Sequence, residues 1–173
     1  VGGNVPPHML PHTEKEYYGT VDIDIAIDPR VLTEATSARL NDILAQNGFY
    51  QRESERPFRY FRDIDVDGDP VSVMVDILSA EYGGEDVGAE YCDIHGVKAL
   101  RAKGSNLAFE RSKLISISGK DADGKEKTIT VRIPMLVPFI VMKVMALHDR
   151  DKPKDAYDIY FCLSNYHGGI NAV

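Results

Sequence analysis

Hydrophobic and polar residues alternate strictly over residues 21–28, and such alternation is typical of a β-strand. Every second residue from Val21 to Ile27 is aliphatic, so these side chains share one face of the strand. Asp22 and Asp24 lie on the other face. We expect the aliphatic face to be buried and the two carboxylates to project away from the core.

Apolar residues follow helical spacing in three segments. Residues 32–46 carry leucine, isoleucine and alanine near every third or fourth position, with Thr33 able to cap the first turn and Gly48 just past the end. Residues 134–148 and 152–163 show a similar spacing, and the proline that opens the former suits the first turn of a helix. The pattern predicts one helix in the N-terminal half and two at the C-terminal end.

Two β-hairpins are predicted between these helices. Glycine and aspartate at 67–69 and at 121–124 favour turns, and apolar segments flank each of them. The predicted strands cover residues 58–66, 71–78, 113–118 and 127–133. Residues 4–19 are expected to be irregular because prolines interrupt them, and residues 79–96 are expected to form a glycine- and acid-rich connection. This order of elements indicates an α+β fold with a mixed sheet.

Composition limits the classes of protein that remain. A length of 173 residues with 43% hydrophobic residues suits one compact domain, and a net charge of -7 argues against non-specific binding to nucleic acid. The apolar segment at 135–147 is too short to span a bilayer, so we expect a cytoplasmic protein with no membrane partner. Cys92 and Cys162 are expected to be free thiols. Because the sequence begins at Val1 with a glycine pair directly after it, we expect the natural chain to extend upstream.

Asp22 and Asp24 are the first candidates for chemistry. They lie two residues apart on one predicted strand, so their carboxylates share a face and need a cation or strong hydrogen bonds to offset their repulsion. Magnesium is suited to such hard oxygen ligands. The alternative is the solvated polar face of an edge strand, on which Asp28 would also lie.

Asp76 favours the metal interpretation. It interrupts the apolar strand VSVMVDILS and shares a face with Met74 and Leu78, where an unpaired carboxylate is costly to desolvate. A third carboxylate on a neighbouring strand would complete a metal site formed by Asp22, Asp24 and Asp76.

Three charged residues near the C-terminus form a second group of candidates. Lys143 lies in the most apolar predicted helix, and Asp155 and Asp158 lie three apart on one face of the last helix. The simpler interpretation of Lys143 is a surface lysine whose stem covers the core. The simpler interpretation of the two aspartates is acids that stabilise a helix N-terminus.

Taken together, these residues resemble a known family. The pieces are the pair Gly2-Gly3, the strand Thr20-Val21-Asp22-Ile23-Asp24-Ile25 and the later Val75-Asp76-Ile77. In this order they resemble the polymerase-beta-like nucleotidyltransferase fold. The segments KVMAL at 143–147 and KDAYDIYFCL at 154–163 are similar to its AbiEii/MenT-like branch, which includes toxins of bacterial toxin–antitoxin pairs. The chain departs from the family in its proline-rich segment after Gly3 and in Tyr18, where an arginine is common.

The resemblance implies an α+β nucleotidyltransferase core over residues 1–133 and a C-terminal helical segment over residues 134–173 packed on it. It implies Mg²⁺ or Mn²⁺ held by the three aspartates, and a catalytic site completed by Lys143 and Asp155. Its phosphate-binding residues would be Gly2, Gly3, Thr20, Lys143 and Asp158, the last of which could also orient or pack Asp155.

The implied function is transfer of a nucleoside monophosphate from a nucleoside triphosphate to an acceptor hydroxyl. The acceptor could be an RNA end such as that of tRNA, a protein or a small molecule, and an antitoxin protein could be a partner. Two alternatives remain open: a catalytically silent nucleotide sensor on the same fold, and a metal-dependent nuclease.

Overall fold

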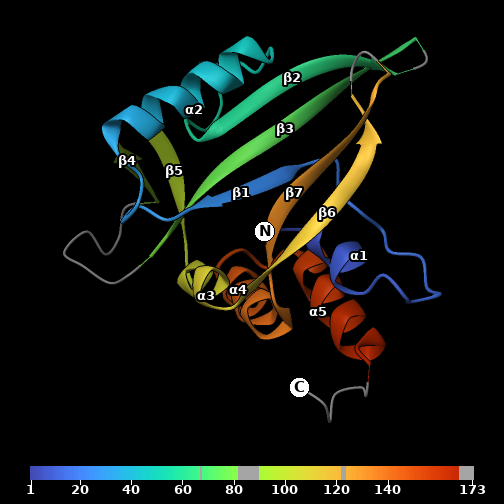
Figure 1. Ribbon diagram of the computed structural model, residues 1–173. Helices are drawn as coiled ribbons and strands as arrows, with labels where there is room; N and C mark the ends of the chain where they lie inside the picture. The colour runs from blue at the N-terminus through green and yellow to red at the C-terminus, as the bar shows by residue number, and fades with distance from the viewer. Residues whose placement is uncertain (67, 82–89, 122–123, 168–173) are drawn as a thin grey trace.

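The computed structural model of the chain is an α+β fold in which a central mixed sheet is flanked by helices, as the sequence predicted (Figure 1). The structure describes residues 1–66, 68–81, 90–121 and 124–167. The helices are α1 Val5–Met9, α2 Glu34–Gln46, α3 Ser105–Glu110, α4 Leu136–Arg150 and α5 Pro153–Asn165. The strands are β1 Ile23–Ile27, β2 Arg59–Val66, β3 Asp69–Ala80, β4 Tyr91–Ile94, β5 Val97–Ala102, β6 Ser112–Lys120 and β7 Glu126–Pro134.

The long strand β3 organises the central sheet. It pairs in parallel with β1 and β5 and antiparallel with β2, while β4 pairs antiparallel with β5. The β1 register covers residues 75–79 of β3, and this range overlaps both the β2 contacts at 69–76 and the β5 contacts at 78–80. Strand β1 therefore occupies one edge of β3, and β2 and β5 share the other edge in succession.

Helix α2 covers one end of one sheet face. Thr33 caps the helix in a reciprocal capping box with Thr36, and Gly48 with φ of 77° follows the C-terminal end. A buried cluster joins the helix to the sheet through Leu44, Tyr60, Val75, Ile77, Ile94, Val97 and Ala99. The alternate residues of β3, including Asp76, therefore face the opposite side.

A second core lies on that opposite side, among α1, α4, α5 and the end of β7. Its buried residues are Val5, Met9, Leu10, Ile133, Leu136, Phe139, Phe161 and Cys162. The hairpin of β6 and β7 forms a separate two-stranded sheet, and Figure 1 shows it beside the central sheet, on the side of β1. None of the helices in the described part of the chain is long and apolar enough to span a bilayer.

Several predicted boundaries were wrong. Residues 4–19 are not wholly irregular, because α1 forms with its prolines in the first turn, where no intrahelical N–H bond is lost. Strand β3 runs on to Ala80 and β4 occupies 91–94, so the predicted connection at 79–96 contains strand at both ends. Helix α4 starts at Leu136, because Pro134 ends β7 and Met135 is the extended N-cap.

The sequence also gave no prediction for β5 and α3. Four predicted segments fall partly outside the described residues. The residues outside the description are 67 in the turn at 67–69, 122–123 in the turn at 121–124, 82–89 in the connection at 79–96, and 168–173 in the C-terminal segment.

The aliphatic face of β1 is not buried as expected. Val21, Ile23 and Ile25 are 64%, 42% and 38% exposed, and only Ile27 packs against the core under α2. The physical reason is that α2 covers just one end of this face, and the hairpin of β6 and β7 does not pack closely against the other end. An apolar groove of about 930 Å³ lies between this hairpin and the central sheet.

Candidate functional site

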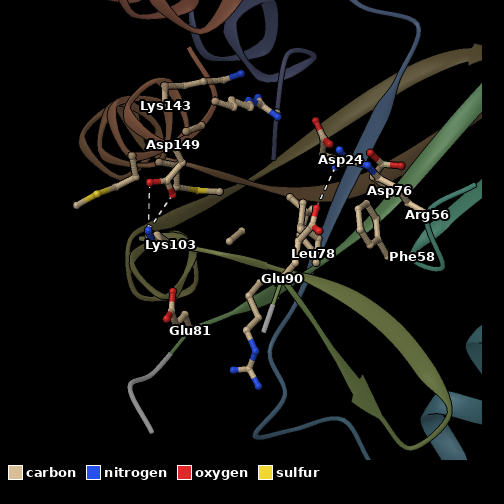
Figure 2. Close-up of a pocket in the computed structure, with 18 of the residues that line it drawn as sticks. Asp24, Arg56, Phe58, Asp76, Leu78, Glu81, Glu90, Lys103, Lys143 and Asp149 are labelled. Carbon is tan, nitrogen blue, oxygen red and sulfur yellow. Dashed lines mark hydrogen bonds and ion pairs between the residues drawn. The ribbon is translucent and has the colours of Figure 1, made fainter. Parts of the chain in front are cut away.

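Two of the predicted carboxylates are direct neighbours on adjacent strands. Asp24 of β1 is in register with Asp76 of β3, and the strands are parallel, so both side chains project from the same face of the sheet. Figure 2 shows the two carboxylates side by side at one cleft. The third acid therefore lies on the same side as the first strand's Asp24, and not on the reverse side of the sheet.

An arginine that the sequence analysis did not select completes this row. Arg59 of β2 is in register with Asp76 on the other edge of β3. Its Nε and Nη2 donate to the two carboxylate oxygens of Asp76 at 2.7 and 2.8 Å, which is a bidentate ion pair. The side chains are 25% and 13% exposed, so the pair is only partly shielded from water. Hydrogen bonding to Asp76 is the main reason that the pKa of Arg59 is raised.

Asp24 is a partly buried carboxylate whose pKa is shifted by its surroundings. Burial is the main cause that raises its pKa above the ordinary value, and the negative charge of Asp76 raises it further. The charges of Lys143 and Arg150 act in the opposite direction and lower it. Burial and the charge of Asp76 thus disfavour the charged form of Asp24, and a divalent cation at the acid pair would offset both effects.

The glycine pair packs directly against this acid. Gly2 has φ of 83°, and a Cβ on it would lie 1.7 Å from Oδ2 of Asp24. A Cβ on Gly3 would lie 2.7 Å from Cγ2 of Thr20 and 3.2 Å from Nζ of Lys154. Both positions need glycine because the backbone approaches other groups too closely for any side chain.

The structure places Asp22 and Thr20 just before β1. The Oγ1 of Thr20 accepts a hydrogen bond from the backbone N–H of Asp22 at 3.2 Å, and Asn4 donates to the carbonyl of Asp22 at 2.7 Å. Oδ1 of Asp22 is buried and makes no hydrogen bond within the described residues. The negative charge of Asp22 contributes to the raised pKa of Arg59. Asp22 is not among the described residues that line the cleft, whereas Asp24 and Asp76 are.

The predicted C-terminal residues form a buried ionic network. Lys143 is 8% exposed, so the simpler interpretation of it as a surface lysine does not hold. Its Nζ lies 2.9 Å from Oδ1 of Asp155 and 2.7 Å from Oδ2 of Asp158. Arg150 donates to both oxygens of Asp155 at 2.8 and 3.0 Å. The two aspartates are 1% and 0% exposed, so they serve as buried counterions in addition to any effect on the helix N-terminus.

This network extends to the N-terminal segment. The hydroxyl of Tyr17 donates to Oδ1 of Asp158 at 2.6 Å, and Lys154 lies 2.8 Å from the same oxygen. Burial and this hydrogen bond raise the pKa of Tyr17 well above its usual value. Burial also raises the pKa of the Cys162 thiol to about 12, so it is no nucleophile at neutral pH.

A cleft of about 670 Å³ joins the sheet acids to the network. One wall holds Asp24, Asp76 and Arg59, and the other holds Lys143 and Arg150 from α4. Figure 2 shows Lys143 on the helix wall, across from the two acids. The volume is in the range of sites for small molecules and cofactors, about 300–1,000 Å³.

The far end of the cleft is also charged. Lys103 pairs with Asp149 at 2.9 Å, as the dashed lines in Figure 2 mark, and Arg56 pairs with Glu90 at 3.3 Å. Phe58 and Leu78 form an apolar floor close to Asp76 (Figure 2). The cleft thus combines an apolar surface with charged groups of both signs.

The donor set at the acids fits a hard divalent cation. Within the described ranges, no three aspartate, glutamate, histidine or cysteine side chains are grouped closely enough to hold a metal by themselves. Magnesium in nucleotide sites is commonly held by one or two carboxylates together with substrate phosphates. The neighbouring carboxylates of Asp24 and Asp76 provide ligands of that type, and Arg59 occupies both oxygens of Asp76 in this structure.

One of the two site residues that the sequence analysis missed could have been found from the sequence. Counting outward from the predicted turn at 67–69 places Arg59 opposite Ile77, whereas the observed register pairs Val66 with Asp69 and therefore Arg59 with Asp76, so the predicted turn misses the ion pair by one residue. Arg150 lies seven residues after Lys143, which is two helical turns, and thus shares its helix face. Comparison of the chain with family models, curated proteins and solved structures gives no match.

Proposed function

We propose that the cleft binds a nucleoside triphosphate with Mg²⁺ or Mn²⁺ and transfers its nucleotide to an acceptor hydroxyl. The observation that carries the proposal is the position of Asp24 and Asp76, in register on one sheet face and opposite Lys143 and Arg150 of α4. The polymerase-beta-like resemblance of the motifs supports the same activity.

Each group in the cleft has a role in this proposal. Asp24 and Asp76 would hold the cation, with Asp22 beside them, and the cation would neutralise charge on the phosphates. Lys143 and Arg150 already carry counterions, and their remaining donors would bind the triphosphate from the opposite wall. Asp155 and Asp158 would position these cations. The Gly2 bend would bring backbone close to the phosphates.

The proposed reaction is an in-line displacement at the α phosphorus. The acceptor oxygen forms a bond to that phosphorus while the bond to the oxygen bridging the β phosphorus breaks, and pyrophosphate leaves. The proton of the acceptor hydroxyl passes to a carboxylate of the acid pair. Positioning and charge neutralisation supply most of the rate enhancement in such transfers.

A transfer assay tests the proposal. The protein is incubated with MgCl₂, nucleoside triphosphates labelled at the α phosphate, and cell extract as the source of acceptor. We expect label in RNA, protein or a small molecule, and loss of at least about a hundredfold in Asp24→Asn and Asp76→Asn. The control is Asp63→Asn, because Asp63 is an exposed aspartate of β2 that pairs with Arg52 rather than with cleft residues.

The same assay separates the alternatives. Binding of nucleotide with no transfer of label, in the wild type, would favour a nucleotide sensor. Shortening of RNA without label would favour a nuclease. Equal transfer by the wild type and by Asp76→Asn would contradict the site as a whole.

A further inference from the structure

The ion pair of Arg59 and Asp76 stands where the proposed function needs a metal ligand. Both oxygens of Asp76 already accept a hydrogen bond from the guanidinium, at 2.7 and 2.8 Å. A carboxylate that is neutralised in this way has less attraction for a divalent cation, because the guanidinium carries the same sign of charge. Arg59 and a cation therefore compete for Asp76.

The pair is built in a way that allows exchange. The Arg59 side chain is 25% exposed, and it lines the same cleft as Asp76. Asp76 is the only acceptor of an Arg59 side-chain hydrogen bond within the described residues. Lys143, in contrast, is bound between two buried aspartates. Because both members of the sheet-side pair are partly exposed, Arg59 can leave Asp76 without stranding a fully buried charge, whereas Lys143 cannot leave Asp158, which is 0% exposed.

The destination of the guanidinium follows from its surroundings. Its other close negative charges are those of Asp22 and Glu55, and an anionic substrate group in the cleft would add a stronger acceptor. A guanidinium presents a planar fork of donors that matches phosphate as well as carboxylate. When a cation reduces the charge of Asp76, phosphate becomes the better partner.

We propose that Arg59 is an exchangeable counterion, which neutralises Asp76 in the empty cleft and passes to a substrate phosphate when a divalent cation occupies the acid pair. This inference rests on the proposed function, and it assigns a phosphate-binding residue that the motifs do not contain. It also couples the two ligands: metal and nucleotide favour each other's binding, since each removes a competitor of the other.

Two binding measurements with opposite expected signs test the exchange. The first is Mn²⁺ affinity without nucleotide, measured by electron paramagnetic resonance of the free ion. We expect Arg59→Gln to bind Mn²⁺ about tenfold more tightly than the wild type, because a competing charge is gone. The second is affinity for ATP in the presence of Mn²⁺, measured by calorimetry, and we expect it to fall about tenfold in the same variant.

Matched variants make the result specific. Arg52→Gln removes an arginine that pairs with Asp63 of β2 but does not line the cleft. This variant should leave both affinities unchanged. Arg59→Lys keeps the charge without the fork, and its Mn²⁺ affinity should stay near that of the wild type. In an Asp76→Asn background, Arg59→Gln should no longer raise the Mn²⁺ affinity. Melting temperatures establish that each variant is folded.

Three results would overturn the inference. If Mn²⁺ binds and depends on Asp24 but is insensitive to Arg59→Gln, Arg59 does not compete and the proposed function survives. If Mn²⁺ binds more tightly but ATP affinity is unchanged, the guanidinium does not pass to phosphate. If neither the wild type nor Arg59→Gln binds Mn²⁺, the proposed metal site fails and the exchange fails with it.

Discussion

The two walls of the cleft hold their charges in different ways. On the helix wall, Lys143 pairs with Asp155 and Asp158, and Arg150 pairs with Asp155. These two carboxylates are 1% and 0% exposed. On the sheet wall, Arg59 and Asp76 form one pair that is partly open to water. Buried carboxylates are costly to leave without a partner, whereas a single pair that is partly exposed costs less to separate.

The difference separates a fixed part of the site from an exchangeable part. The helix wall is a preorganised set of cations, which can stabilise an anion without moving. The sheet wall carries acids whose neutralising partner can be replaced. Variants of the two walls should therefore differ in their effects on stability and on activity.

Removal of a buried acid should have the largest effect. Asp158→Ala leaves Lys143 and Lys154 with one partner fewer and strands the hydroxyl of Tyr17. Loss of one partner from a buried pair costs about 3–5 kcal/mol, which lowers the melting temperature by roughly 6–20 °C for a chain of this size. Thermal denaturation followed by circular dichroism measures it. A change no larger than that of the exposed control Asp149→Asn would contradict a fixed, buried network.

The pH dependence of stability should show the same network. Burial tends to raise the pKa of Asp155, but hydrogen bonds from Arg150 and Lys143 outweigh it, so its pKa lies below the ordinary 3.8. Its contribution to stability is present above pH 3.8 and is lost as the pH falls through the lowered pKa. The difference in melting temperature between wild type and Asp155→Asn should therefore be constant near neutrality and shrink in acid.

The contribution of Lys143 to stability depends on pH in the opposite direction and is lost at alkaline pH. Burial lowers the pKa of Lys143, but its hydrogen bonds to Asp158 and Asp155 outweigh this effect and raise the pKa above the ordinary 10.5. Its contribution is complete below pH 10.5 and is lost as the pH rises through the raised pKa. The melting-temperature difference between wild type and Lys143→Met should stay constant up to pH 10.5 and narrow above it. A difference that narrows near neutral pH would contradict this assignment.

Substitution at the glycine bend should affect the sheet wall alone. In Gly2→Ala, the new Cβ would meet Asp24 and the residue would hold an unfavourable positive φ, so the acid must move. Displacement by about 1 Å can cost a hundredfold in rate, and we expect transfer to fall by about that factor. Gly119→Ala is the control, since its Cβ would meet no described atom within 4 Å. Equal transfer by both variants would show that the bend has no part in the site.

The sheet-wall ion pair should have the smallest effect on stability. Arg59→Gln removes a partly exposed pair, and we expect a cost of about 1 kcal/mol, which corresponds to roughly 2–4 °C in melting temperature. Circular dichroism under the conditions used for Asp158→Ala gives the comparison. A loss as large as that of Asp158→Ala would show that the pair is a structural element and not an exchangeable one.

Elements with strong local patterns could be predicted from the sequence. The strict alternation around Asp24, the helical spacing and cap of α2, and the turn chemistry of both hairpins act over a few residues, so their strands and helices form where the pattern predicted. The predicted turn at 67–69 did not specify the pair of Arg59 and Asp76, because it displaces the hairpin register by one residue. The local patterns also did not predict β4, β5 or α3, whose short segments show no clear period. Strand β5 pairs with β3, β4 pairs with β5, and α3 packs on α4.

Only the tertiary structure decided which charges meet. Asp24 and Asp76 are 52 positions apart in sequence and become neighbours through the parallel pairing of β1 with β3, which no local pattern specifies. The same holds for the exposure of Ile23 and Ile25 and for the burial of Lys143. Local sequence sets which face of an element is apolar, but what covers that face depends on how distant elements pack, because burial is a property of the whole fold.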